Sequence, residues 1–275
     1  MSNSAITFSI VNQKGGVGKT TSAINLATAF AQRSKKVLII DMDPQGNAST
    51  GIGIGYDNRQ NTIYETLINQ CNIDDAIIKT KVKNLDIITS TVDLSGIEVE
   101  MANYHNREFL LKDKIDRIEN KYDYIFIDCP PSLGLLTINT LCATDYILIP
   151  MQCEFFSLEG LSHLLTTLEL VRDNLNSNLK IAGIMLTMHD RRNKLTEAVE
   201  NDVRSYIGEK VFKNIVPRNI RLSEAPSHGM PGILYDSKCK GSIAYKKLAF
   251  EILGKEFSNV SRETKLNNKN EAKRI

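Results

Sequence analysis

Short apolar runs alternate along the chain with longer stretches in which apolar and polar residues mix. The runs are rich in β-branched residues and apolar at nearly every position, and they cover residues 6–11, 37–40, 85–88, 124–127, 146–149 and 181–186. Strands that are buried on both faces, as in a parallel sheet, have this pattern. The runs therefore predict a set of buried, parallel strands.

The stretches between these runs repeat apolar residues with a period near that of an α-helix. They cover residues 20–31, 158–171, 194–207 and 243–253. Alternation of strand and helix predicts a doubly wound α/β fold with a mostly parallel sheet. Because no repeat and no clear linker interrupts the pattern, we expect one domain over residues 1–257. Residues 258–275 are polar, and we expect a disordered tail there.

The composition narrows the class of protein. The chain has 275 residues, is 42% hydrophobic and carries a formal net charge of +2. A charge this small argues against a wholly basic nucleic-acid-binding chain, but it leaves room for a local basic patch. No run approaches the roughly 18 apolar residues of a membrane span, and the start lacks a secretory signal. Five cysteines without a Cys-x-x-Cys pair then predict a reducing, cytoplasmic location.

A segment rich in glycine and lysine joins the first predicted strand to the first predicted helix. It reads Lys14-Gly15-Gly16-Val17-Gly18-Lys19-Thr20-Thr21. Glycines let backbone N–H groups converge on phosphate oxygens, and the helix N-terminus adds a positive dipole. Lys19 would reach the β- and γ-phosphates, and the Thr20 hydroxyl would bind Mg²⁺. The segment therefore predicts a P-loop that binds ATP and Mg²⁺.

The loop departs from the ordinary P-loop at its start, where Gln13 replaces the first glycine and Lys14 follows. A second lysine this close would either neutralise more of the triphosphate's charge or point away from its own site. The motif resembles the deviant Walker A motif of the ParA/MinD family of ATPases, and the resemblance extends over residues 5–253. It implies an ATP-dependent homodimer in which Lys14 reaches across the interface to the partner's nucleotide.

Acidic residues end two of the predicted strands. Asp41 and Asp43 follow one run, and Asp128 follows another. The carboxyl ends of strands form the edge where open α/β sheets bind ligands, and such an aspartate suits a Mg²⁺-holding Walker B element. The two segments resemble the family's switches. The resemblance implies that Asp43 positions or activates the attacking water, that Asp43 and Asp128 join Thr20 in the metal shell, and that Asp41 supports the first switch. Which carboxylate takes the proton stays open.

Residues 216–229 resemble the family's base-binding loop, in the form seen in chromosomal ParA (Soj) proteins. The resemblance implies that Pro217 and Asn219 lie near adenine, with Met188 packed nearby. Proline fixes the backbone against a base, and an asparagine amide can read its edge. Both residues are also common in ordinary turns, which is the alternative interpretation.

Basic residues gather in the same half of the chain, and the family comparison assigns Arg192 and Arg221 to the DNA backbone. The expected partner is double-stranded DNA, bound without sequence preference and in a salt-sensitive way. A dimer doubles the phosphates contacted, so DNA affinity would depend on ATP. The family further implies a ParB-like centromere-binding partner that stimulates a slow hydrolysis, and a location on the nucleoid.

Two other branches of the family give alternative functions. A MinD-like, membrane-associated division-site ATPase carries a C-terminal amphipathic helix, whereas the apolar residues after 257 form no helical stripe, so we expect no membrane partner. A metal-cluster carrier ATPase needs thiolates at a subunit interface, and the cysteines here are isolated. The expected function is chromosome or plasmid partition, and the choice between these two stays open.

Overall fold

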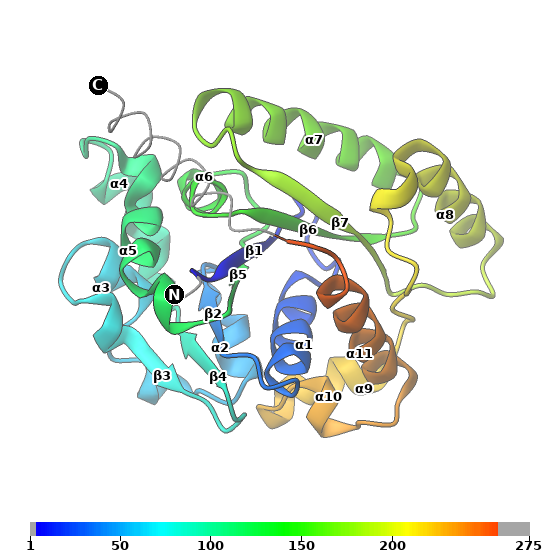
Figure 1. Cartoon of the computed structure of the whole chain (residues 1–275), viewed down its shortest axis with the longest axis horizontal. Helices are drawn as coiled ribbons and strands as arrows, with labels where there is room; N and C mark the ends of the chain where they lie inside the picture. The colour runs from blue at the N-terminus through cyan, green and yellow to red at the C-terminus, as the bar shows by residue number, and fades with distance from the viewer. Residues whose placement is uncertain (1–3, 258–275) are drawn as a thin grey trace.

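The computed structural model describes residues 4–257, in which helices cover both faces of one sheet (Figure 1). The strand order is β3-β4-β2-β5-β1-β6-β7, and only β3 of these runs antiparallel to its neighbour. The strands are β1 (Ile6–Ile10), β2 (Val37–Asp41), β3 (Ile77–Lys79), β4 (Leu85–Ile88), β5 (Tyr124–Asp128), β6 (Tyr146–Gln152) and β7 (Lys180–Thr187). The predicted doubly wound α/β fold is confirmed. The predicted tail over 258–275 lies outside the described residues.

The helices include the four that the periodicity predicts and several that it does not. The α-helices are α1 (Lys19–Ala31), α2 (Asn47–Gly51), α3 (Ile63–Leu67), α4 (Ile97–Glu100), α5 (Leu110–Ile118), α6 (Leu135–Cys142), α7 (Ser157–Asn174), α8 (Lys194–Ile207), α9 (Ile220–Glu224), α10 (Gly232–Tyr235) and α11 (Lys240–Leu253). Short 3₁₀ helices cover Tyr56–Asn58, Ile73–Ala76, Val92–Gly96, Arg107–Phe109, Glu119–Lys121, Gly208–Lys210 and Ala225–His228.

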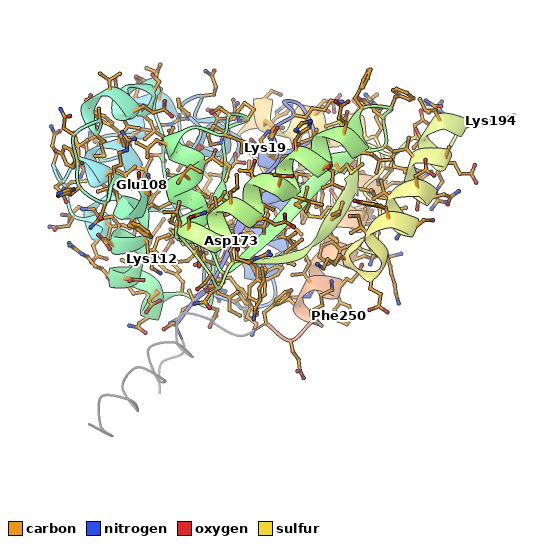
Figure 2. The ribbon with its side chains drawn as sticks, turned by 90° about the horizontal axis from the view of Figure 1, so that it is seen from above. Lys19, Glu108, Lys112, Asp173, Lys194 and Phe250 are labelled. Atoms are coloured by element: carbon orange, nitrogen blue, oxygen red, sulfur yellow. The ribbon has the colours of Figure 1, made fainter. Side chains whose placement is uncertain are left out.

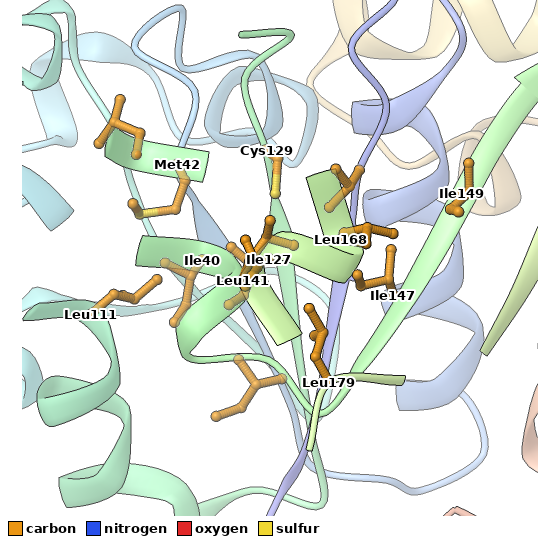
Figure 3. Packing of buried hydrophobic residues seen from close by; sticks show 14 of the residues in the cluster. Ile40, Met42, Leu111, Ile127, Cys129, Leu141, Ile147, Ile149, Leu168 and Leu179 are labelled. Atoms are coloured by element: carbon orange, nitrogen blue, oxygen red, sulfur yellow. The ribbon is translucent and has the colours of Figure 1, made fainter. Parts of the chain in front are cut away.

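Alternate residues of the central strands supply two hydrophobic cores, one on each face of the sheet. Ile125 and Ile127 of β5 pack with α5, α6, α7 and α8, whereas Phe126 packs with α1 and α11. Figure 3 shows part of the first core, where Ile127 of β5 lies near Leu141 of α6 and Leu168 of α7. Because both faces of these strands are buried, they read as continuous apolar runs.

The register of the sheet decides which side chains meet at its carboxyl edge. Asp128 at the end of β5 pairs with Ile10 of β1 on one side and with Asp41 of β2 on the other. The loop that leaves β1 leads directly into α1. The sheet therefore places two buried carboxylates beside the start of that loop, at the edge where open α/β sheets bind ligands.

The core next to this edge can be tested at Ile127, which is fully buried one residue before Asp128. Ile127→Ala should lower the free energy of unfolding by about 2–5 kcal/mol, because it removes buried methyl groups and leaves a cavity. Val99→Ala, at a position that is 82% exposed, is the control and should change it by less than about 0.5 kcal/mol. Urea unfolding measures both, and equal losses would contradict this assignment of the core.

Candidate nucleotide-binding site

The P-loop takes a conformation that its glycines permit. Gly16 and Gly18 have φ angles of 72° and 87°, in the left-handed region that residues with a Cβ rarely adopt. Gly18 is also the N-cap of α1 and provides no side-chain cap, so the first N–H groups of the helix remain available to a bound anion. Asn12 accepts a hydrogen bond from the Lys14 N–H at 2.9 Å and so braces the start of the loop.

Lys19 lies against the loop, and its side chain is buried. Its ammonium donates to the Lys14 carbonyl oxygen at 3.0 Å. Burial lowers the pKa of Lys19, while the nearby Asp128, Cys129 and Asp43 favour the charged form. A cation in this position can stabilise the phosphate charge that builds up during phosphoryl transfer.

Lys14 lies only five positions before Lys19, but its surroundings are different. Its side chain is half-exposed and forms an ion pair with Glu154, which follows β6. The pair holds the Lys14 ammonium at the surface, beside the loop. This position is compatible with a lysine that acts on a nucleotide other than its own.

The loop is held by polar residues at the ends of β6 and β7 that the sequence analysis does not single out. Gln152 donates to the Gly16 carbonyl at 3.0 Å, and the Thr187 hydroxyl donates to the Val17 carbonyl at 2.8 Å. Asn12 donates to the Pro150 carbonyl at 2.7 Å. The rule that points to Asp41 and Asp128, a polar residue at the carboxyl end of a strand, would also have found Gln152 and Thr187.

The carboxylates at the edge of the sheet have different surroundings. Asp41 is buried and accepts hydrogen bonds from the N–H and hydroxyl of Ser49, at 2.8 and 2.7 Å, so it ties β2 to α2. Asp43 accepts from the Gln45 N–H at 2.9 Å. Asp128 is fully buried, and neither carboxylate oxygen has a well-formed hydrogen bond with a described residue. Burial and the charge of Asp41 raise the pKa of Asp128, and the nearby Thr20 hydroxyl offsets part of this rise.

This set of oxygens fits Mg²⁺. A buried carboxylate without a hydrogen-bond partner is costly unless a cation compensates it, and Asp128 lies close to the Thr20 hydroxyl. Within residues 4–257 no three acidic, histidine or cysteine side chains converge on one point. Mg²⁺ itself takes a few protein oxygens and completes its shell with phosphate and water. Thr20 and Asp128 would hold the ion, with Asp43 close by.

The candidate base-binding residues meet beside the P-loop. Met188, whose φ of 48° is also in the left-handed region, directly follows Thr187 of β7. Residues 216–218 run along the end of that strand, where the His189 N–H donates to the Val216 carbonyl and His189 pairs with Pro217. Asn219 caps α9 by accepting from the Arg221 N–H at 3.0 Å. The Asn219 side-chain carbonyl accepts this bond, and its NH₂ group can donate to an acceptor on a base.

A polar contact joins this region to the P-loop helix. Asn25 of α1 donates to the Thr21 carbonyl at 2.8 Å and accepts from the Ile233 N–H at 2.9 Å. Gly53 and Gly229 approach so closely that a Cβ at Gly53 would lie 2.6 Å from the Gly229 carbonyl. Residues 216–233 therefore touch both the P-loop helix and the segment after α2.

Both arginines that the family comparison assigns to DNA are exposed, and both have acidic partners in the same chain. Arg192 makes two hydrogen bonds to Asp190, at 3.0 and 2.8 Å. These bonds hold the pKa of Asp190 well below its usual range. Arg221 pairs with Glu224 at 2.9 Å and lies 3.8 Å from Asp236. A phosphate would have to compete with these carboxylates.

Similarity to known proteins agrees with this geometry. A family model described as an AAA domain matches residues 5–181. The chromosome partitioning protein ParA of Caulobacter vibrioides is 51% identical over 251 residues, which cover 90% of this chain and 94% of that protein. The chromosome-partitioning ATPase Soj of Treponema pallidum is 49% identical over 91% of this chain and 98% of its own. A cobyrinic acid a,c-diamide synthase of Mycobacterium smegmatis, solved with ADP and magnesium, has a TM-score of 0.80 and 30% identity over 90% of this chain and 94% of its own.

The fold and the loop define a P-loop ATPase of the deviant Walker type, which hydrolyses ATP with Mg²⁺. The chain belongs to the ParA/MinD family of ATPases, in its ParA/Soj branch, and is a partition ATPase. Among the helices of residues 4–257, none has the length and apolar character needed to cross a membrane.

The buried carboxylates make stability depend on pH. Burial raises the pKa of Asp41 to about 6, from an ordinary value of 3.8. Between these values the folded chain keeps a proton that the unfolded chain has lost, so the Asp41 contribution to the free energy of unfolding falls as pH rises. In protein free of nucleotide and Mg²⁺, Asp41→Asn should therefore make the free energy of unfolding fall less steeply between pH 4 and about 6.

Urea unfolding at several pH values measures this decline, and Asp202→Asn, an exposed carboxylate on α8, is the matched control. The control should keep the slope of the unaltered chain. An unchanged slope in Asp41→Asn would contradict the assignment of that proton to Asp41.

Proposed function

We propose that this partition ATPase is an ATP-dependent dimerising switch that binds DNA without sequence preference. The observation that supports this proposal best is the position of Lys14. Lys14 pairs with Glu154 at the rim of the P-loop, whereas the Lys19 ammonium donates to a carbonyl within the loop. A lysine at the rim can exchange its carboxylate partner for the phosphates of a second subunit. In this proposal ATP drives that exchange, and two subunits close around two nucleotides.

An exposed aromatic pair next to Glu154 supports an interface at this rim. Phe155 and Phe156 are 72% and 70% exposed, and their ring centroids lie 5.1 Å apart in an edge-to-face arrangement. Adjacent exposed aromatic side chains are enriched at protein interfaces, where burial stabilises them. We propose that they form the apolar part of a dimer contact whose polar part is Lys14.

The chemistry assigned to this chain is positioning and charge stabilisation. Lys19, Lys14 of the second subunit and the P-loop N–H groups would hold the phosphates, and Mg²⁺ would neutralise their charge from Thr20 and Asp128. Asp43 lies close enough to favour the charged form of Lys19, so it is near the phosphate end of the site. We propose that Asp43 positions or activates the attacking water. Met188, Pro217 and Asn219 would hold the base.

Arg192 and Arg221 are proposed to bind DNA phosphates. Each would exchange an exposed carboxylate for a phosphate, and exposed ion pairs are worth only about 0–1 kcal/mol. One subunit should therefore bind DNA weakly, whereas a dimer that places four arginines on one duplex binds more tightly. This makes DNA binding depend on the ATP-dependent dimer. A ParB-like centromere-binding partner would then stimulate hydrolysis and release the subunits from the nucleoid.

Retention on a duplex of arbitrary sequence, with ATP, ADP or no nucleotide, tests the proposal. DNA should be held only with ATP. It should be held longer by Asp43→Ala, which slows hydrolysis. Arg221→Ala should weaken binding about tenfold at 0.15 M salt, because each dimer loses two phosphate contacts. Asp190→Asn should strengthen it, because Arg192 loses its competing partner.

Arg117→Ala, an exposed arginine on α5, is the control and should bind as the unaltered chain does. Retention that ignores the nucleotide, or an Arg117→Ala loss equal to that of Arg221→Ala, would contradict the proposed switch.

A further inference from the structure

A groove of about 1220 Å³ lies away from the P-loop, between α11 and residues 208–214. Arg33, just past the end of α1, closes one side of it. The 13 residues of α1 separate this arginine from the P-loop, which corresponds to about 20 Å along the helix. In Figure 2, Lys19 of the P-loop is labelled in the upper part of the molecule and Phe250 of the groove near its lower border.

The lining of this groove is strongly basic. It contains six cationic residues, Arg33, Arg204, Lys213, Lys246, Lys247 and Lys255, against two acidic ones. One of the acids, Glu251, already accepts hydrogen bonds from the N–H groups of Lys213 and Asn214, at 2.7 and 3.0 Å. Lys213 and Lys247 are exposed and form no ion pair with any residue in 4–257. The groove thus presents uncompensated positive charge, although the chain as a whole is nearly neutral.

The groove also exposes apolar surface on α11. Phe250 is 69% exposed and Ile243 is 41% exposed, and both line it. The Arg33 guanidinium lies over the Phe250 ring, 5.8 Å from its centroid, which is a cation–π geometry. A ligand that complements this surface needs negative charge together with an apolar group.

We propose that this basic groove binds an acidic peptide segment of a partner protein, with one apolar side chain packed on Phe250 and Ile243. Acidic side chains on either side of that anchor would pair with Lys213 and Lys247. A nucleic acid fits less well, because a duplex offers no apolar group to cover Phe250, and Arg33 already occupies one face of the ring on which a single-stranded base would stack. The groove is remote from the P-loop rim, so the segment could bind whether or not two subunits have closed around ATP.

The probe is a fluorescein-labelled decapeptide with six glutamates around a central Leu-Phe pair. The full-length protein is titrated into it in the presence of ADP and in the absence of ATP and DNA. Fluorescence anisotropy should show saturable binding. Lys213→Glu combined with Lys247→Glu should weaken it about tenfold or more, because two attractions become repulsions. Phe250→Ala alone should weaken it severalfold by removing the anchor contact, without changing the charge. Neither change touches the P-loop, so ATP hydrolysis reports that the variants are folded.

Lys79→Glu combined with Lys112→Glu, two lysines outside the groove, is the charge-matched control and should bind the probe as the unaltered chain does. Equal losses in both double variants would overturn the proposal, since only net charge would then matter. Equal binding of a decapeptide with glutamine in place of glutamate would also overturn the proposal. So would a single-stranded oligonucleotide that displaces the labelled probe completely at a lower concentration than the unlabelled decapeptide does. Because the assay omits ATP and DNA, its outcome is independent of the proposed switch.

Discussion

The site depends on the burial of two neighbouring carboxylates. The pairing of β2 with β5 places Asp41 beside Asp128, and both are fully buried. Ser49 compensates Asp41 by two hydrogen bonds, but Asp128 has no such partner among the described residues. Burial and the charge of Asp41 raise the pKa of Asp128, and a buried carboxylate without compensation favours the binding of cations nearby. Lys19 supplies one positive charge near these two carboxylates. Mg²⁺ bound with a nucleotide would supply further positive charge.

The remaining parts of the site follow from the same edge of the sheet. Gln152 and Thr187, at the ends of β6 and β7, hold the backbone of the P-loop by its carbonyls. This leaves the N–H groups that follow Lys14 in the loop, and those of the first turn of α1, for phosphate. Met188 and Pro217 meet at the end of β7, and Glu154 holds Lys14 at the rim. The proposed sites for nucleotide, metal and partner subunit thus share one edge of the sheet, whereas the basic groove lies past the other end of α1.

Much of this could be predicted from the sequence, because buried parallel strands and a glycine-rich phosphate loop leave strong local patterns. The limits of α8 match the periodicity residue for residue, and the strands differ only at their ends. The apolar pattern does not predict the short strand β3, because three edge residues carry no clear period, or α5 and α6, which have only nine and eight residues. Contacts between distant segments, such as Lys14 with Glu154 or Thr187 with Val17, depend on tertiary structure, and no local pattern encodes them.

The central claim is that Lys14 acts on the partner's nucleotide, and mixed dimers test it most directly. Lys14→Ala and Asp43→Ala should each be inactive in ATP hydrolysis. In a mixed dimer, the Lys14→Ala subunit keeps its own Lys19 and Asp43 and receives Lys14 from the Asp43→Ala subunit, so one of the two sites is complete. An equal mixture should recover about a quarter of the unaltered turnover, because about half of the dimers are mixed. No recovery, with mixed dimers shown to form, would mean that Lys14 acts within its own subunit and would contradict the account.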